Sequence, residues 1–463
     1  MLLRNNLPSL DESSADPAGI SITHSNELCD FKTVTTDEVY RKIGKLAGKS
    51  CVLDPLPALS QKKRLNELLP VLTQIMNLSL TSACVPSDTK IAVLKLLLKK
   101  PSLDCELFPN FRPVSDLKFI SKVIEKEVAR QLTEYLERTN QAVVFQSAYK
   151  KHHSTEIALF RVQNDILCAI DDNKAVVLLL DLSAAFDKVD HEILISRLFN
   201  RFGIKGNVLD WFSSYLHDRK QFVSINGHNS LLHTLQYGVP QGSVLGPLLY
   251  LLYTSPFADI LQKHEMSYHL YADGSQIYTT FTFSSYTEME IVKNRMMDCT
   301  KDIDRWMTVN KLKINKDKSK LIVFSSRYRQ QTLFNSLQVG GQDFIICSES
   351  VRNIGITFDR TLTMSDHINV TCKSAYYHLR NIRRIRTYLT YNTAAILVHA
   401  LVSSKLDHGN SLLYGLSKYQ LSKLHCPECC GSCCLAVSLT RKYDHITPVL
   451  FELHWPPVEY RIK

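Results

Sequence analysis

Hydrophobic residues recur at helical spacing through much of the N-terminal half of the chain. Thr35 and Glu38 form the signature of a capping box, and Val39 and Ile43 follow on one face of the helix that it would start. Residues 1–34 are polar and acidic without periodicity, which predicts a loose leader. The helical spacing predicts further helices near residues 65–76, 120–132, 155–170 and 194–202.

The middle of the chain combines strand and turn patterns. Residues 176–180 form a continuous apolar run that is typical of a buried strand, and KLIVF at 320–324 predicts another strand. The Asn-Gly pair at 226–227 and the Asp-Gly pair at 273–274 each predict a hairpin turn. Predominantly helical sequence follows from Ser365, and we find no internal repeats. This alternation predicts an α+β protein with a helical C-terminal part.

Composition and charge narrow the classes of protein. Hydrophobic residues make up 45% of the 463 residues and charged residues 22%, which is ordinary for a folded protein. The net charge of +10 favours a polyanionic partner such as nucleic acid, but only modestly. No apolar stretch reaches the roughly 18 residues of a membrane span, and the N-terminus has no apolar core of signal-peptide length. We therefore expect the 13 cysteines to be reduced thiols.

Two aspartates stand at the ends of apolar segments. Asp181 follows the strand at 176–180, where an ionised carboxylate needs solvent or a cation. Asp273 lies in the second hairpin turn and would face Asp181 if the two strands were neighbours. Paired carboxylates repel one another unless divalent cations occupy the site, and Mg²⁺ suits oxygen ligands. At this point Asp181 can equally be a helix N-cap, and Asp273 an ordinary turn residue.

A loop rich in glycine and proline lies between these aspartates in the sequence. The segment GVPQGSVLGP holds three glycines and two prolines in ten residues, with Gln241 and Gly242 near its centre. Such a loop can bring backbone amides close to a ligand, although it is also typical of a simple turn. The order and separation of the loop and the two aspartates favour one shared site.

Six segments, read in order, resemble the successive motifs of LINE-type (non-LTR) reverse transcriptases, and those of the jockey-like group in particular. They are RPVSDL, FQSAYKKHHSTEIAL, LLLDLSAAFDKVDH, GVPQGSVLGPLLY, YADG and WMTVNKLKINKDKSKLIVF. The resemblance covers residues 35–420 and resumes at Arg441. It implies an α+β right-hand polymerase with fingers, an antiparallel-sheet palm and a helical thumb. The implied divisions are a leader at 1–34, an N-terminal extension and fingers at 35–175, a palm at 176–330 with part of the fingers within 190–235, and a thumb and C-terminal helical region at 331–463 that is degenerate near 425–438.

The resemblance also implies a set of site residues. Asp181 and Asp273 match the metal-binding aspartates, which would hold two Mg²⁺ ions or Mn²⁺ in their place. Phe186 matches the aromatic gate that excludes a ribose 2′-hydroxyl, although its residue type alone favours a buried core position. Gln241 and Gly242 match the loop that touches the incoming nucleotide and the template.

Basic residues complete the set. Lys318 matches a lysine near the nucleotide phosphates and is a candidate proton donor to pyrophosphate, unless KINKDKSK is only a solvated turn. Arg112 falls in the fingers motif and would meet template or triphosphate. The partners that the resemblance implies are an RNA template, a DNA primer and dNTPs. It implies that the protein acts in the nucleus or the cytoplasm and does not bind a membrane. One predicted C-terminal helix carries both basic and tyrosine residues: Lys373, Tyr376, Tyr377, Arg380, Arg383, Arg384 and Arg386. This helix would either lie along the duplex as a thumb helix or present a solvated basic face.

The chain departs from the family pattern in three places. Gly274 replaces the second of two adjacent aspartates, so we expect a folded palm with weak or absent polymerase activity. HCPECCGSCCLAV replaces an amphipathic helix, and its five cysteines form either a zinc site or, as we favour, a degenerate stretch: Cys426, Cys429, Cys430, Cys433 and Cys434. The N-terminus lacks the motifs of the endonuclease domain that usually precedes the polymerase, which predicts a fragment of a decayed element.

These departures leave alternative functions open. The first is a catalytically inactive, nucleic-acid-binding remnant of such an element. An RNA-dependent RNA polymerase would share the carboxylates but not Phe186 at the gate. A purely structural scaffold is the least favoured, because the motifs stand in order.

Overall fold

The structure is a computed structural model, and its described residues form two compact units that are interleaved along the chain. The first unit comprises 1–144, 183–263 and 302–314, and the second comprises 145–182, 264–301 and 315–463. Each unit is described by itself below. The residues that the structure describes are 27–44, 51–180, 186–225, 227–282, 285–314, 318–326, 328, 334–339, 343–424, 451, 455–456 and 458–462.

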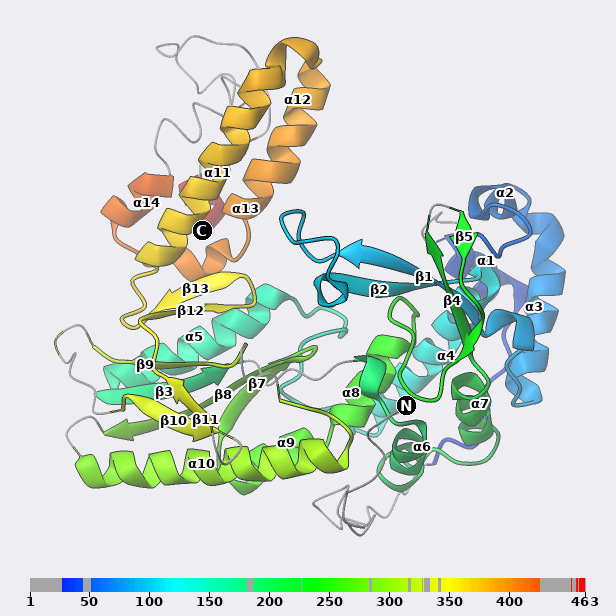
Figure 1. Ribbon diagram of the computed structural model, residues 1–463, viewed down its shortest axis with the longest axis horizontal. Helices are drawn as coiled ribbons and strands as arrows, with labels where there is room; N and C mark the ends of the chain where they lie inside the picture. The colour runs from blue at the N-terminus through cyan, green and yellow to red at the C-terminus, as the bar shows by residue number, and fades with distance from the viewer. Residues whose placement is uncertain are drawn as a thin grey trace. The chain divides into compact units, whose positions relative to one another are not determined.

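The first unit packs helices around a small mixed sheet (Figure 1). The sheet has the order β2-β1-β4-β5, with β6 also paired to β4; β1 is antiparallel to β2 and parallel to β4. Its helices are α1 (Thr36–Gly44), α2 (Ala58–Lys63), α3 (Leu65–Thr81), α4 (Phe119–Arg138), α6 (His191–Asn200), α7 (Gly206–Leu216), α8 (Gly246–Thr254) and α9 (Phe257–Lys263), with short 3₁₀ turns η2 (Ser87–Thr89), η3 (Phe108–Asn110) and η4 (Phe186–Lys188). Its strands are β1 (Ile91–Leu98), β2 (Phe111–Leu117), β4 (Lys220–Ile225), β5 (His228–Asn229) and β6 (His233–Thr234).

The second unit is built on an antiparallel sheet of order β7-β8-β3-β9, followed by helices. Its strands are β3 (Lys174–Leu180), β7 (Ser267–Tyr271), β8 (Gly274–Thr282), β9 (Lys320–Phe324), β10 (Ser336–Val339), β11 (Asp343–Ile346), β12 (Ser350–Asn353) and β13 (Ile356–Asp359). Its helical segments are α5 (Thr155–Asp171), α11 (Ser365–Ile385), η5 (Arg386–Tyr388), α12 (Tyr391–Val398), the π-helix η6 (His399–Ser403), α13 (Ser404–Leu406), η7 (Asn410–Leu413), α14 (Lys418–Leu424) and α17 (Val458–Ile462). Helix α10 (Tyr286–Val309) begins in the second unit and ends in the first.

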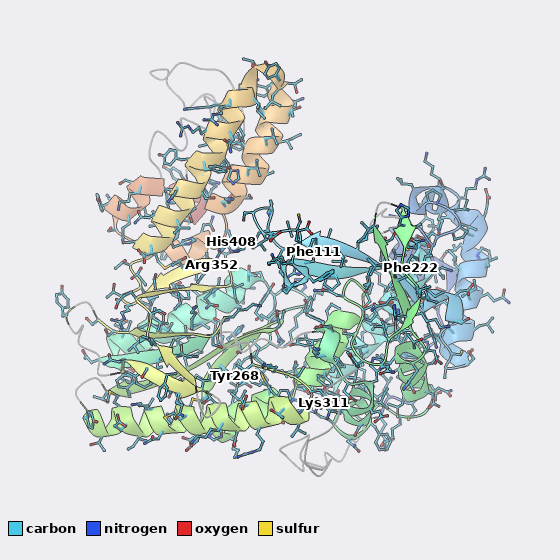
Figure 2. All side chains as sticks on the ribbon, in the orientation of Figure 1. Phe111, Phe222, Tyr268, Lys311, Arg352 and His408 are labelled. Carbon is cyan, nitrogen blue, oxygen red and sulfur yellow. The ribbon has the colours of Figure 1, made fainter. Side chains whose placement is uncertain are left out.

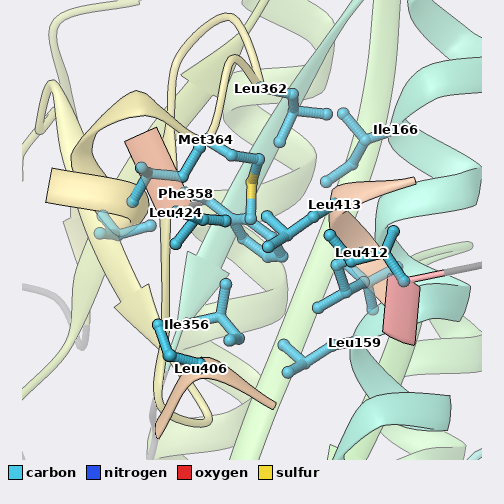
Figure 3. Packing of buried hydrophobic residues seen from close by; sticks show 14 of the residues in the cluster. Leu159, Ile166, Ile356, Phe358, Leu362, Met364, Leu406, Leu412, Leu413 and Leu424 are labelled. Carbon is cyan, nitrogen blue, oxygen red and sulfur yellow. The ribbon is translucent and has the colours of Figure 1, made fainter. Parts of the chain in front are cut away.

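Strand β3 is the buried centre of the second unit. Val176 and Leu178 point to one face of the sheet, where they join a cluster that includes Leu159 and Ile166 of α5 (Figure 3). The same cluster continues into α11 and the segments that follow it, so the sheet and the C-terminal helices share one core. Side chains on both faces of β3 are buried, since Val176, Val177 and Leu178 have no exposed surface, and this confirms the prediction of a buried strand for the positions whose side chains the structure describes.

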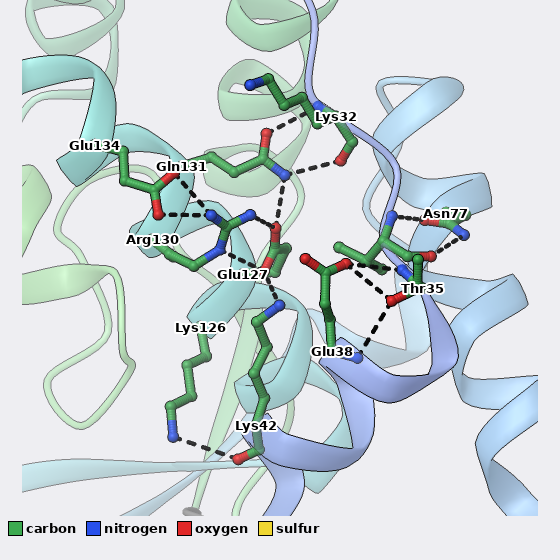
Figure 4. Close-up of polar contacts among 11 residues, drawn as sticks. Lys32, Thr35, Glu38, Lys42, Asn77, Lys126, Glu127, Arg130, Gln131 and Glu134 are labelled. Carbon is green, nitrogen blue, oxygen red and sulfur yellow. Dashed lines mark hydrogen bonds and ion pairs between the residues drawn. The ribbon is translucent and has the colours of Figure 1, made fainter. Parts of the chain in front are cut away.

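A buried carboxylate ties the N-terminal segment of the first unit to α4. The Glu127 side chain is fully buried and lies 2.5 Å from Lys42 Nζ and 2.6 Å from Arg130 Nη2 (Figure 4). Gln131 donates to the Glu127 carboxylate at 2.7 Å and also bonds the backbone N–H and C=O of Lys32. Burial raises the pKa of Glu127, but the bonds from Arg130, Lys42 and Gln131 outweigh it, so its pKa is lowered from the ordinary value.

Most element boundaries follow the sequence prediction. Thr35 and Glu38 form the capping box, with the Thr35 N–H donating to Glu38 Oε2 at 2.9 Å. The strand at 320–324 is confirmed, and the helix from Ser365 begins at that residue. The α+β class is therefore confirmed, with an antiparallel sheet and a helical C-terminal part.

The second hairpin turn was predicted one residue too far along the chain. Tyr271 pairs with Gly274, so the loop residues are Ala272 and Asp273, and Gly274 is the first residue of β8. The strand ladder sets this register, because Leu270 pairs with Ser275 in the step before it. Ala272 consequently takes the left-handed conformation, with φ of 56°, in place of the glycine that the Asp-Gly signature suggested.

The cysteines of the described residues are free thiols. The five clustered cysteines at 426–434 lie outside the described residues. In the same described part of the chain, no helix combines the length and the apolar character that a membrane crossing requires.

We predict that Glu127→Ala destabilises the first unit by about 3 kcal/mol, because Lys42 and Arg130 lose the carboxylate that compensates them. Glu134→Ala removes an exposed partner of the same arginine and should cost much less. Urea unfolding followed by tryptophan fluorescence measures this, since Trp211 and Trp306 belong to this unit.

The pH dependence provides a check on the same prediction. The pKa of Glu127 is lowered on folding, so its stabilisation is present above the ordinary carboxyl pKa of 4.5 and is lost as the pH falls. The gap between the wild type and Glu127→Ala should therefore narrow in acid. Equal costs for the Glu127 and Glu134 variants would contradict the assignment.

Candidate active site

The register of the second unit's sheet brings three chain segments to one end of it. Leu180, the last residue of β3, pairs with Gln276 of β8 on one side and with Lys320 of β9 on the other. Both neighbours run antiparallel to β3, so the start of β8 and the start of β9 lie where β3 ends. Asp273 precedes Gln276 by three residues, and Lys318 precedes Lys320 by two.

The predicted aspartates differ in how far the structure describes them. Asp181 follows Leu180 directly in the chain and lies outside the described residues. Asp273 is exposed at the hairpin tip, and Lys318 is exposed as well. The structure therefore places the Asp273 hairpin and the segment around Lys318 at the end of the sheet where β3 stops.

Gly274 has room for a side chain. Its backbone is outside the left-handed region, and a Cβ atom there would meet only the Tyr271 carbonyl oxygen, at 3.3 Å. This contact is tight but needs a shift of only a few tenths of an ångström. An aspartate at position 274 therefore needs no left-handed backbone, but it requires a small shift of the Tyr271 carbonyl.

In the first unit, Phe186 is stacked on an aromatic ring of α8. The Phe186 and Tyr250 ring centroids are 4.3 Å apart with an interplanar angle of 29°. Tyr250 is buried, whereas Phe186 is only half-buried, so Phe186 is not a fully enclosed core residue. The Phe186 carbonyl accepts the Val239 N–H at 3.1 Å, which joins the segment after Asp181 to the loop at 238–247.

That loop is fastened to strand β2, which carries the RPVSDL segment. The Ser115 N–H donates to the Gln241 carbonyl at 2.7 Å. Gly242 has φ of 120°, and a Cβ there would lie 2.6 Å from the Ser115 carbonyl oxygen. Only glycine fits this conformation and this approach. Arg112 stands three residues before Ser115 on the same strand and is exposed; it follows Phe111 in the sequence, which Figure 2 labels.

A buried glutamate holds the other end of the loop, and the sequence analysis did not single it out. Glu125 on α4 accepts the N–H groups of Val244 at 2.7 Å and Leu245 at 3.2 Å, where α8 begins. These donors have no partner within a helix, so the carboxylate satisfies them. Burial raises the pKa of Glu125, while the buried Arg219 and the two N–H bonds oppose that rise. The sequence did hold one sign that Glu125 is buried. It stands three residues before Val128 and seven before Leu132, which places it on the buried face of the predicted helix.

The predicted site residues therefore fall into two groups. The first unit brings Gln241 and Gly242 against the strand of Arg112 and joins Phe186 to the same loop. The second unit brings Asp273 and Lys318 toward the end of β3. Within the described part of the chain, no group of three or more His, Cys, Asp or Glu side chains is placed to hold a metal ion.

The architecture and these motifs agree with a comparison of the sequence with protein families. Residues 98–358 match the model of the family described as reverse transcriptase (RNA-dependent DNA polymerase). The match covers more than half of the 463 residues. This chain belongs to the reverse transcriptase family.

Proteins with similar sequences include polymerases of fruit-fly mobile elements. The RNA-directed DNA polymerase from mobile element jockey of Drosophila melanogaster is 26% identical over 346 residues, which are 73% of this chain and 36% of that protein. The probable RNA-directed DNA polymerase from transposon BS of the same species is 26% identical over 385 residues, or 80% of this chain and 41% of that protein. The chain spans about two fifths of the length of these relatives. The predicted resemblance to the jockey-like group is confirmed.

We predict that Gly242→Ala destabilises the first unit by about 2–3 kcal/mol, since it adds both backbone strain and a clash with Ser115. Gly227→Ala is the matched control, because Gly227 also has a positive φ but open space around it. The control should cost about 1 kcal/mol in the same urea experiment. Equal losses of stability in the two variants would show that a Cβ atom at position 242 does not clash with Ser115 of β2.

Proposed function

We propose that this chain is the polymerase region of a non-LTR retrotransposon reverse transcriptase, an RNA-directed DNA polymerase that extends a DNA primer on an RNA template with dNTPs. The observation that carries the proposal is the sheet register that ends β3 beside the Asp273 hairpin. Asp181 follows that strand end in the sequence, so two carboxylates would meet at one end of the sheet. The family membership supports the same reaction.

Polymerases of this family use divalent metal ions, and we assign two Mg²⁺ ions to this chain, with Mn²⁺ as a substitute. Asp273 suits the role, because its carboxylate is an exposed, hard oxygen donor at an open hairpin tip. Asp181 would be the second protein ligand. When bound, the ions would stabilise charge on the attacking and leaving oxygens of the phosphoryl transfer.

The remaining site residues would bind and orient the substrates. The Phe186 ring, fixed by Tyr250, would exclude a ribose 2′-hydroxyl, which would lose hydration against it without gaining a partner. Gln241 and Gly242 would contact the incoming nucleotide, and Arg112 the template or triphosphate. Lys318 would give a proton to the leaving pyrophosphate. We further propose the fingers, palm and thumb divisions given by the sequence.

The missing second aspartate favours a second candidate function, a nucleic-acid-binding remnant without polymerase activity. Gly274 leaves the hairpin tip with a single carboxylate. Such a remnant would bind template–primer and incorporate no nucleotide.

Gly274→Asp should raise the rate of Mg²⁺-dependent primer extension by about 10-fold or more, because it restores a carboxylate at the metal site. Gly274→Asn is the matched control, similar in size but without charge, and should gain little. The assay compares the wild type and both variants on one RNA template with one DNA primer. Equal and brisk extension by all three would contradict the assigned role of position 274.

The same assay separates the alternative functions. No extension by any variant, together with retained template–primer binding, would favour the inactive remnant. Preferential incorporation of ribonucleotides would favour an RNA-dependent RNA polymerase instead, and would conflict with the role proposed for Phe186.

Helix α11 offers a face suited to a nucleic-acid duplex. Lys373, Tyr377, Arg380 and Arg384 are exposed and follow one another at intervals of four, three and four residues, so they share one face of the helix. The opposite face packs into the core through buried residues such as Leu379. Basic side chains on a fixed helix hold phosphates without reading sequence, and the tyrosine adds a flat contact surface.

Arg380→Glu combined with Arg384→Glu should weaken template–primer binding and lower the slope of log affinity against log salt by about 2, since two phosphate contacts are lost. Lys301→Glu combined with Arg305→Glu on α10 changes the net charge equally and is the control. Fluorescence anisotropy across a salt series measures both. If both double variants lost the same affinity for template–primer, the loss would be explained by net charge alone, which would contradict the α11 assignment.

A further inference from the structure

A short segment from the FQSAYKK motif covers the free edge of the sheet beside the Asp273 hairpin. The Leu270 N–H donates to the Phe145 carbonyl at 2.7 Å, and the Ser147 N–H donates to the Leu270 carbonyl at 3.0 Å. Gln146 thus forms an isolated parallel bridge with Leu270 of β7. The segment 145–147 therefore runs along β7 immediately before the hairpin loop.

The Gln146 side chain reaches the strained residue of that loop. Its Oε1 accepts the Ala272 N–H at 3.2 Å and the Ala148 N–H at 2.9 Å. Ala272 has φ of 56°, a left-handed conformation that is strained for a non-glycine residue. A hydrogen bond from outside the hairpin therefore restrains the residue directly before Asp273.

The neighbours of Gln146 keep its side chain in place. Gln146 is 95% buried, and the Phe145 ring packs edge-on against Tyr268 of β7 at 5.3 Å (Figure 2 labels Tyr268). On the other side, Ser147 Oγ and His269 Nε2 are 2.9 Å apart and both are buried. Burial is the largest cause that lowers the pKa of His269, to about 4, so this histidine is neutral at assay pH and carries no competing charge.

We propose that Gln146 is a positioning residue that fixes the Ala272–Asp273 loop, so that the Asp273 carboxylate is preorganised for a divalent cation. The metal-binding role of Asp273 in this proposal rests on the proposed function. The restraint of the loop rests on the hydrogen bonds described above. Gln146 itself touches neither metal nor substrate. Its effect passes through one backbone amide, that of Ala272.

Two substitutions separate the effect of the Gln146 hydrogen-bond acceptor from the effect of the side chain's volume. Gln146→Glu keeps an oxygen acceptor at the same reach, and a buried carboxylate that accepts two backbone N–H groups already exists in this chain at Glu125. Gln146→Leu keeps much of the volume and removes the acceptor. Ser147→Ala is the matched control, because it removes a buried bond in the same segment and leaves the Ala272 amide bonded to Gln146.

Amide hydrogen exchange of the full chain, resolved at Ala272, tests the contact without any catalysis. Gln146→Leu should speed exchange there by about 5-fold, the equivalent of roughly 1 kcal/mol for one hydrogen bond. Gln146→Glu and Ser147→Ala should leave it near the wild-type rate. An unchanged rate in Gln146→Leu, or an equal rise in Ser147→Ala, would overturn the proposal.

Metal dependence then tests the consequence, in a Gly274→Asp background. Gln146→Leu should raise the Mg²⁺ concentration for half-maximal extension by about 10-fold, the usual effect of losing a group that orients a metal ligand. Its rate at saturating Mg²⁺ should stay close to the background, and Gln146→Glu should behave as the background. A loss of rate with an unchanged Mg²⁺ requirement would contradict preorganisation. If no variant extends a primer, the proposed function fails, and hydrogen exchange still decides the role of Gln146.

Discussion

Strand β3 is hydrogen-bonded along both edges, and the position of every group at the end of the sheet depends on that pairing. The backbone of Leu180 pairs with Gln276 of β8 on one side and with Lys320 of β9 on the other. A slip of one residue would move each side chain of β3 to the opposite face of the sheet and displace Asp273 from the strand end. Packing opposes such a slip, because Val176 and Leu178 would have to leave the cluster that they form with Leu159 and Ile166 of α5. The packing of the core thus determines the geometry of the site.

Each unit then holds its loop with a buried acceptor that takes two backbone N–H groups. In the first unit Glu125 binds the amides of Val244 and Leu245 after the Gln241–Gly242 turn. In the second unit Gln146 binds those of Ala148 and Ala272. Buried N–H groups without a partner are costly, so each acceptor both stabilises and shapes its loop. The chemistry proposed for this family member is carried by loops, and these two side chains restrict how the loops move.

The sequence predicted what depends on local pattern. The β9 strand and the start of α11 at Ser365 follow from apolar periodicity and are confirmed. The hairpin tip was misplaced by one residue because strand pairing, not the Asp-Gly signature, sets the turn. Glu125 and Gln146 were missed because their bonds join residues 119 and 126 positions apart, which no local pattern encodes. The roles of all the candidate site residues stay predictions: Arg112, Asp181, Phe186, Gln241, Gly242, Asp273 and Lys318.

Anomalous diffraction from crystals grown with Mn²⁺, a dNTP and a template–primer duplex tests the central claim most directly. We predict a manganese peak within about 2.2 Å of carboxylate oxygens from both Asp181 and Asp273. Bound duplex with the two carboxylates apart, and no metal between them, would contradict the account.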